Sequence, residues 1–235
     1  MSKYFTLLII FTFVIAMFSF SKPTSAAIET KYVSCGDSKL NVKKDKNKTS
    51  ATIGQLRNGK KVKVLGESSD WAKITYSNKT GYVPTKNLKN KLPSYLKNTN
   101  KTYYYNNGVW GEIYKTSYNK STKLWEDTLD ETVFFKYKEF EYGTKHVKVI
   151  VDSAINGFDF TGDYSELPRN MYKGMKIYDY KKKYVGKVIT VNKTLKVRAG
   201  TFKNVVQVKE KYGISYYAPN IGLIKTDTEE LVEIE

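Results

Sequence analysis

Cysteine and histidine are nearly absent from this chain of 235 residues, which contains one of each. The single cysteine, Cys35, excludes an internal disulfide, a cysteine-based zinc site and an iron–sulfur cluster. The single histidine, His146, cannot supply the several histidine ligands of a zinc amidase or endopeptidase. The two residues fall in different predicted domains, and Cys35 does not stand at the start of a helix that would lower its pKa. We therefore do not expect them to form the catalytic pair of a papain-like peptidase.

A glycine-rich phosphate loop is also missing. A glycosidase needs two carboxylates that flank a cleft. Asp127 lies near Asp130 and Glu131, and Asp159 lies near Asp163, but acidic residues in turns are usually solvated. We therefore expect a protein without enzymatic activity, without catalytic residues and without a metal or cofactor. A carboxylate-based wall hydrolase remains the weakest alternative.

Long apolar runs are confined to the N-terminus. Lys3 precedes the stretch Phe5 to Phe20, and a segment with Pro23 then ends in Ala26-Ala27. This order of charged start, apolar stretch and small residues predicts a secretory signal peptide over residues 1–27. Cys35 is too distant from the apolar stretch for a lipid anchor. We expect a secreted or cell-wall-associated protein from a Gram-positive bacterium.

Acidic residues are too few to balance the basic ones, and the formal net charge is +17. Residues 27–90 hold fourteen basic and five acidic side chains, whereas residues 91–235 carry a net charge of only +6. An exported basic protein meets peptidoglycan and teichoic acid before it meets nucleic acid, so we expect a wall partner and no nucleic acid. A positive field accelerates association with such polyanions. The alternative is that the lysines keep a tyrosine-rich β protein soluble and protect its sheet edges.

Helical periodicity is absent beyond the signal peptide. The chain is instead rich in tyrosine and phenylalanine, which favour strands, and it alternates polar with apolar residues in several stretches. These stretches predict strands at 61–65, 132–142, 146–151, 185–191 and 205–208. The fold class is therefore all-β.

A polar segment with little periodicity, residues 91–101, interrupts the strand pattern. It contains Pro93, and it predicts a linker. The mature chain is thereby divided into a small domain over residues 28–90 and a larger domain over residues 102–235.

The small domain carries six short motifs in a fixed order. They are Leu40-Asn41-Val42-Lys43, Ile53-Gly54-Gln55-Leu56, Gly59, Val62-x-Val64, Asp70-Trp71-Ala72-Lys73-Ile74 and Gly81-Tyr82-Val83. Residues 31–88 with these motifs resemble a bacterial SH3 domain (SH3b). Lys43 stands where the family usually has arginine, and the lysine-rich stretch 44–48 replaces the usual Ser-Gly-Pro turn. The resemblance implies a small antiparallel barrel.

The resemblance also implies non-catalytic binding of peptidoglycan or an anionic wall polymer. Aromatic side chains with one polar end suit such a surface. Residues that we expect to contact the ligand are Tyr32, Lys43, Lys44, Trp71, Tyr76 and Tyr82. The alternative for Trp71 is a place in the barrel core, and Cys35 is expected to be unreactive near the first strand.

The larger domain shows a weaker resemblance. Its motifs include Asn107-Gly108-Val109-Trp110, Leu167-Pro168, Lys173-Gly174-Met175-Lys176, the stretch 195–206 and the stretch 216–225. They are similar to those of a β-rich domain in uncharacterised Gram-positive lipoproteins and exported proteins. By analogy with lipoprotein carriers, an antiparallel sheet could curl and hold a lipid or another apolar ligand on its concave face. A packed core is the commoner outcome, and a protein partner for this domain is the other alternative.

Overall fold

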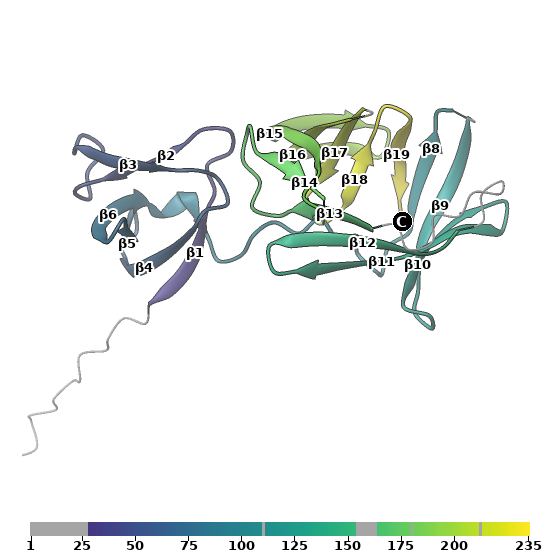
Figure 1. Cartoon of the computed structure of the whole chain (residues 1–235), viewed down its shortest axis with the longest axis horizontal. Coiled ribbons are helices and arrows are strands. Elements are labelled where there is room, and N and C mark those ends of the chain that lie inside the picture. The colour runs from purple at the N-terminus through teal and green to yellow at the C-terminus, as the bar shows by residue number, and fades with distance from the viewer. Residues whose placement is uncertain (1–27, 110, 154–163, 180, 212) are drawn as a thin grey trace, which may run out of the picture.

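The computed structural model describes residues 28–109, 111–153, 164–179, 181–211 and 213–235. The predicted signal peptide lies outside these residues, as do Asp159 and Asp163. Apart from the 3-10 turn η2 (Thr85–Asn87), the described chain consists of strands and loops, which confirms the all-β prediction. None of its helical segments is long and apolar enough to span a membrane. Two antiparallel sheets lie end to end along the molecule (Figure 1).

The first sheet is a small barrel of seven short strands in the order β3-β2-β6-β5-β4-β1-β7. Its strands are β1 (Glu29–Val33), β2 (Leu40–Lys43), β3 (Thr52–Leu56), β4 (Lys61–Glu67), β5 (Trp71–Tyr76), β6 (Lys79–Pro84) and β7 (Leu88–Lys89). Alternation decides which side chains enter the core. Val42, Ala72, Ile74 and Val83 are fully buried, whereas Lys73 between two of them is exposed.

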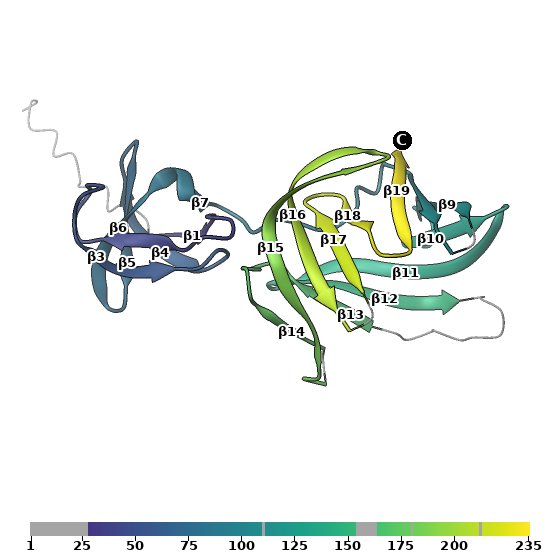
Figure 2. The same ribbon diagram turned by 90° about the horizontal axis from the view of Figure 1, so that it is seen from above.

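The second sheet contains twelve antiparallel strands and curls around a concave interior (Figure 2). Its first strands are β8 (Tyr103–Asn107), β9 (Glu112–Asn119), β10 (Leu124–Leu129), β11 (Thr132–Tyr142), β12 (Lys145–Ser153) and β13 (Tyr164–Pro168). The others are β14 (Lys176–Tyr178), β15 (Tyr184–Val197), β16 (Gly200–Glu210), β17 (Ile214–Ala218), β18 (Gly222–Lys225) and β19 (Glu229–Ile234).

The order β13-β12-β11-β10-β9-β8-β19-β18-β17-β16-β15-β14 places β13 and β14 at the two ends of this sheet. Both figures show these two strands near each other, yet no described residues pair across them. We call this boundary the seam. The predicted strand 132–142 coincides with β11, and the predicted strand 205–208 lies within β16.

The segment predicted as a linker, residues 91–101, packs against the larger sheet. Leu92 and Tyr95 are 6% and 2% exposed, and Tyr95 belongs to a core cluster with Met171. The Arg169 guanidinium donates to the carbonyl oxygens of Leu92 and Pro93 at 3.1 and 2.9 Å. The segment is therefore a structural part of the larger domain.

Side-chain contacts also join the barrel to the larger domain. The Asn58 side chain accepts a hydrogen bond from the Cys35 backbone N–H at 2.9 Å and donates one to the Met171 carbonyl at 2.9 Å. The Arg57 guanidinium lies 4.7 Å from the centre of the Tyr172 ring. These contacts hold one end of the barrel against the β13–β14 connection and leave its other end in solvent.

Candidate functional site

The outer face of the barrel brings together three of the residues predicted to bind a ligand. Cross-strand register aligns Lys43 of β2 with Tyr82 of β6, and aligns Tyr82 with Lys73 of β5. Trp71, two residues before Lys73, pairs with Pro84 and so lies diagonally beside Tyr82. Cross-strand and diagonal neighbours on one face are close enough for their side chains to interact. We call Lys43, Trp71, Lys73 and Tyr82 the outer-face row.

Trp71 is half-buried and lies outside the core cluster of the barrel. Its neighbours in β5, Ala72 and Ile74, alternate inward, so Trp71 faces outward. The alternative that placed Trp71 in the core was therefore wrong.

Lys43 supports the loop that follows it. Its ammonium donates to the Ser50 carbonyl at 2.9 Å and to the Thr52 hydroxyl at 3.0 Å. This side chain fixes the two ends of the lysine-rich loop, whereas Lys44 within the loop is exposed. Lys44 is thus free to meet a ligand, and Lys43 contributes its charge from a fixed position.

Tyr76 and Tyr32 lie apart from the outer-face row. Tyr76 alternates inward with Ile74, packs against the barrel core and covers Gly54, where an added Cβ would lie 2.1 Å from the tyrosine hydroxyl. Tyr32 is on β1, beyond β5 and β4 in the sheet order, and pairs with Lys61 and Lys89. The predicted set therefore does not form one continuous surface.

Cys35 sits beside β1 and is half-buried. Its thiol donates to the Ser38 carbonyl at 3.0 Å, and burial raises its pKa. A raised pKa leaves little thiolate at neutral pH, so this thiol is a weak nucleophile.

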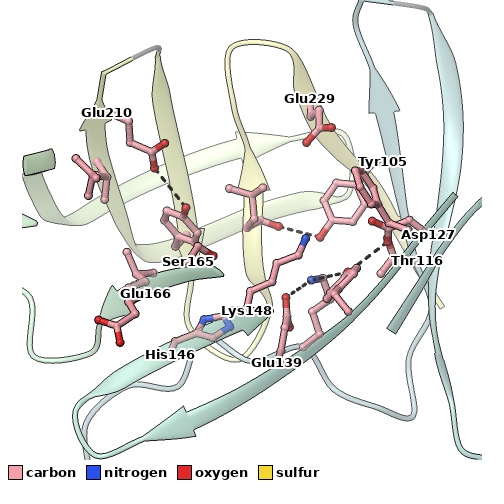
Figure 3. A pocket seen from close by; sticks show the side chains of 18 of the residues that line it. Tyr105, Thr116, Asp127, Glu139, His146, Lys148, Ser165, Glu166, Glu210 and Glu229 are labelled. Carbon is pink, nitrogen blue, oxygen red and sulfur yellow. Dashed lines mark hydrogen bonds and ion pairs between the residues drawn. The ribbon is translucent and has the colours of Figure 1, made fainter. Parts of the chain in front are cut away.

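The larger domain contains a second candidate site, a cavity of about 450 Å³ on the concave side of its curled sheet. Figure 3 shows that its side chains come from strands far apart in the sequence. The described lining mixes aromatic rings with charged groups of both signs. This size lies within the range of small-molecule pockets.

Asp127 of β10 lies at one side of the cavity and is 5% exposed. Its carboxylate accepts hydrogen bonds from the Thr116 hydroxyl at 2.6 Å and from the Tyr137 hydroxyl at 3.3 Å. Burial raises the pKa of Asp127 against the opposing effects of Lys148 and of these hydrogen bonds. The expectation of a solvated turn residue was wrong for Asp127, whereas Asp130 and Glu131 do form the exposed β10–β11 turn.

Lys97 and Glu139 form an ion pair in the cavity wall, with an Nζ–Oε1 distance of 2.8 Å and side chains only 6% and 5% exposed. Lys97 also donates to the Tyr137 hydroxyl at 3.3 Å. Burial alone would raise the pKa of Glu139, but the nearby cations, Lys97 first among them, hold it below its usual value. The second carboxylate oxygen, Oε2, has no hydrogen-bond partner among the described residues.

Lys148 of β12 stands opposite Glu139 in the β11–β12 register. Figure 3 shows its side chain pointing into the cavity. The ammonium lies 3.7 Å from the centre of the Tyr137 ring, and among the described residues it has no hydrogen-bond acceptor and no carboxylate within 4.0 Å. Burial lowers its pKa, and Asp127 is the first of the carboxylates that oppose this shift.

His146 precedes Lys148 by two residues and is 7% exposed. Neither ring nitrogen has a partner among the described residues. Burial lowers the pKa of the imidazole, so the ring is neutral at pH 7. A neutral imidazole has one donor and one acceptor nitrogen, and both are unsatisfied here.

Comparison with known proteins identifies the barrel. A family model described as "Bacterial SH3 domain" matches residues 38–89. No curated protein and no solved structure matches the chain. The match covers β2 to β7 and includes the whole outer-face row. Residues 38–89 thus constitute a bacterial SH3 domain, which suggests a general role in cell-wall binding.

Proposed function

We propose that this chain is an exported, non-catalytic envelope protein whose SH3 domain binds peptidoglycan or an anionic wall polymer through the outer-face row. The observation that carries the proposal is the alignment of Lys43, Tyr82 and Lys73 across three neighbouring strands, with Trp71 diagonal to the tyrosine. Aromatic faces can pack on the polymer, while the two lysines meet its anionic groups.

The charge of the small domain supports the same partner. Residues 27–90 carry a net charge of +9 within 64 positions, and Lys44, Lys46 and Lys48 are exposed in the loop beside the outer-face row. Attraction between exposed charges is screened by salt. Binding to a polyanion should therefore weaken as ionic strength rises.

Sedimentation of residues 28–235 with purified cell wall tests the proposal. We expect co-sedimentation with native wall, weaker binding at 0.5 M than at 0.05 M salt, and at least about tenfold weaker binding of Trp71→Ala/Tyr82→Ala. The matched control is Tyr142→Ala, which removes a tyrosine that is 74% exposed on the larger domain. Equal binding of the double variant and the control would contradict the role of the outer-face row.

Wall stripped of teichoic acid separates the two polymers. Loss of binding to stripped wall assigns the anionic polymer, and retained binding assigns peptidoglycan. Release of reducing sugar ends from either wall during incubation would contradict the non-catalytic part of the proposal.

A carrier or sensor function of the larger domain is the second candidate, and the cavity of about 450 Å³ is the observation that favours it. A sheet packed shut would leave no room for a ligand. The charged lining disfavours a wholly apolar ligand, because buried charges lose their hydration unless the ligand replaces it.

A further inference from the structure

The cavity of the larger domain presents hydrogen-bonding groups that no described residue satisfies. The Lys148 ammonium points into it, lies 3.7 Å from the centre of the Tyr137 ring, and has no hydrogen-bond acceptor among the described residues. His146, which is 93% buried, offers two unpartnered nitrogens, and Glu139 offers one unpartnered carboxylate oxygen. Two of these groups can donate a hydrogen bond and two can accept one.

The three side chains form one cluster because of strand pairing. Glu139 and Lys148 are cross-strand partners in β11 and β12, and His146 shares the face of Lys148 two residues away. Thr116 and Tyr137 both bond to Oδ1 of Asp127, and no described residue bonds to its other oxygen. Unsatisfied hydrogen-bond donors and acceptors thus lie near one another on the neighbouring strands β10, β11 and β12.

Three kinds of ligand fit this cluster poorly. An apolar molecule would leave every one of these groups without a partner, at a high desolvation cost. An anion would satisfy Lys148 but would face the carboxylates of Asp127, Glu139 and Glu229, which line the same cavity. A cation would satisfy the carboxylates but would leave Lys148 unpaired and repelled.

A hydroxyl group donates one hydrogen bond and accepts two, so a polyhydroxylated ligand can match both signs at once. The cavity also contains flat apolar faces on which a sugar ring can pack. Tyr105 and Tyr114 stack with ring centres 5.4 Å apart, and Phe134 meets Tyr114 edge-on at 5.5 Å. All three rings line the cavity.

We propose that this cavity is a saccharide-binding site, with Lys148, His146 and Glu139 as the groups that hydrogen-bond the sugar hydroxyls and with Tyr105, Tyr114 and Phe134 as its apolar walls. The site lies in the larger domain and is separate from the outer-face row. The inference therefore stands or falls independently of wall binding by the SH3 domain.

Isothermal titration calorimetry of residues 28–235 tests the proposal with soluble probes. The saccharide probes are N,N′-diacetylchitobiose, maltose and sucrose, and the comparison probes are dodecylamine and laurate. We expect saturable binding of at least one saccharide below about 10 mM. No saccharide binding up to that concentration, or preferential binding of either comparison probe, overturns the proposal.

Substitutions then locate the bound sugar. Lys148→Met keeps the aliphatic stem and removes the donor, so we expect at least tenfold weaker saccharide binding. The matched control, Lys138→Met, removes an exposed lysine from the outer face of β11, the face that also carries Lys136. This variant should leave the affinity for the saccharide unchanged. Circular dichroism verifies that each variant is folded. Equal affinity of both variants means that the sugar binds elsewhere and overturns the assignment of the cavity.

Discussion

The Asp37 carboxylate of the barrel accepts a hydrogen bond from the Thr190 hydroxyl of the larger domain at 2.6 Å. Its other oxygen accepts the backbone N–H of Val191 at 2.7 Å. Thr190 and Val191 lie where the β15–β16 register shifts, and such an irregularity leaves backbone groups without a ladder partner. The barrel thus completes the hydrogen bonding of a strand in the other domain.

Replacement of Asp37 by alanine should expose this strand irregularity. We expect Asp37→Ala to lower the free energy of unfolding by about 1–2 kcal/mol, because the Val191 N–H and the Thr190 hydroxyl lose a charged acceptor. Amide hydrogen exchange at Val191 should accelerate. The matched control is Asp45→Ala, whose carboxylate bonds only within its own loop. Unchanged exchange at Val191 in Asp37→Ala would show that the domains do not meet in this way in solution.

Gly54 should be required for the inward position of Tyr76. A Cβ at Gly54 would lie 2.1 to 2.4 Å from the tyrosine hydroxyl and ring atoms, so Gly54→Ala should displace the ring and lower stability by about 1–3 kcal/mol. Gly66→Ala is the matched control, because no atom lies within 4 Å of its added Cβ. Chemical denaturation measures both. In the background of Tyr76→Ser, the Gly54→Ala substitution should change the free energy of unfolding very little. If the losses from the two substitutions simply add in the double variant, the steric cause is refuted.

The buried ion pair of Lys97 and Glu139 should be costly to break from one side. Lys97→Met should lower the free energy of unfolding by about 3–5 kcal/mol, because the Glu139 charge remains buried without its partner. Addition of Glu139→Leu should restore a large part of this loss. Lys136→Met removes the lysine of a pair with Asp152 whose side chains are 37% and 57% exposed, and should cost less than about 1 kcal/mol. Equal losses from both single variants would contradict the burial of Lys97.

His146 should make the protein less stable in mild acid. Burial lowers the pKa of His146 in the folded state below the value of 6.5 that it has in the unfolded chain. Between the folded-state and the unfolded-state pKa, the unfolded chain therefore binds more protons than the native protein. Stability then falls as the pH decreases through 6.5, by at most about 1.4 kcal/mol per pH unit. The measurement is urea denaturation at pH 7.5, 6.5 and 5.5, with His146→Gln as the variant that lacks this titration.

Neighbouring groups set the background of this pH dependence. Burial raises the pKa values of Asp127 and Glu229, so their protonation favours the native state as the pH falls, opposite in sign to His146. The pKa of Glu139 is lowered, so the stability that its ionised carboxylate contributes is lost only below about pH 4.5. Because these groups remain in His146→Gln, the difference between the two proteins isolates the imidazole. Parallel stability curves would mean that His146 is not buried as a neutral ring.

The barrel was predictable because its sequence pattern is local. Leu40 and Val42 alternate inward within four residues, and Gly59 adopts the positive φ, +73°, that its turn requires. The outward orientation of Trp71 was harder to predict from the sequence, because large aromatic side chains are usually buried. Its place follows from the inward position of Ala72 and Ile74 in the same strand.

The cavity could not be predicted from local sequence. Lys97, Asp127 and Lys148 are separated by tens of residues, and each has the sequence context of a solvated charge. The alternation in β12 even predicts that the polar face with His146 and Lys148 meets water. The curl of the sheet instead turns that face inward, and curvature depends on all twelve strands together.

The seam gives the larger domain a mechanical property that its other strand boundaries lack. Between neighbouring strands the backbone ladder resists separation, whereas no described hydrogen bond pairs β13 with β14. Leu167 of β13 and Ile177 of β14 both line the cavity. Leu167 packs against the core cluster that contains Ile177, so apolar side chains close the seam where a hydrogen-bonded ladder is missing. Widening the cavity at this position would separate side chains and would leave every ladder intact.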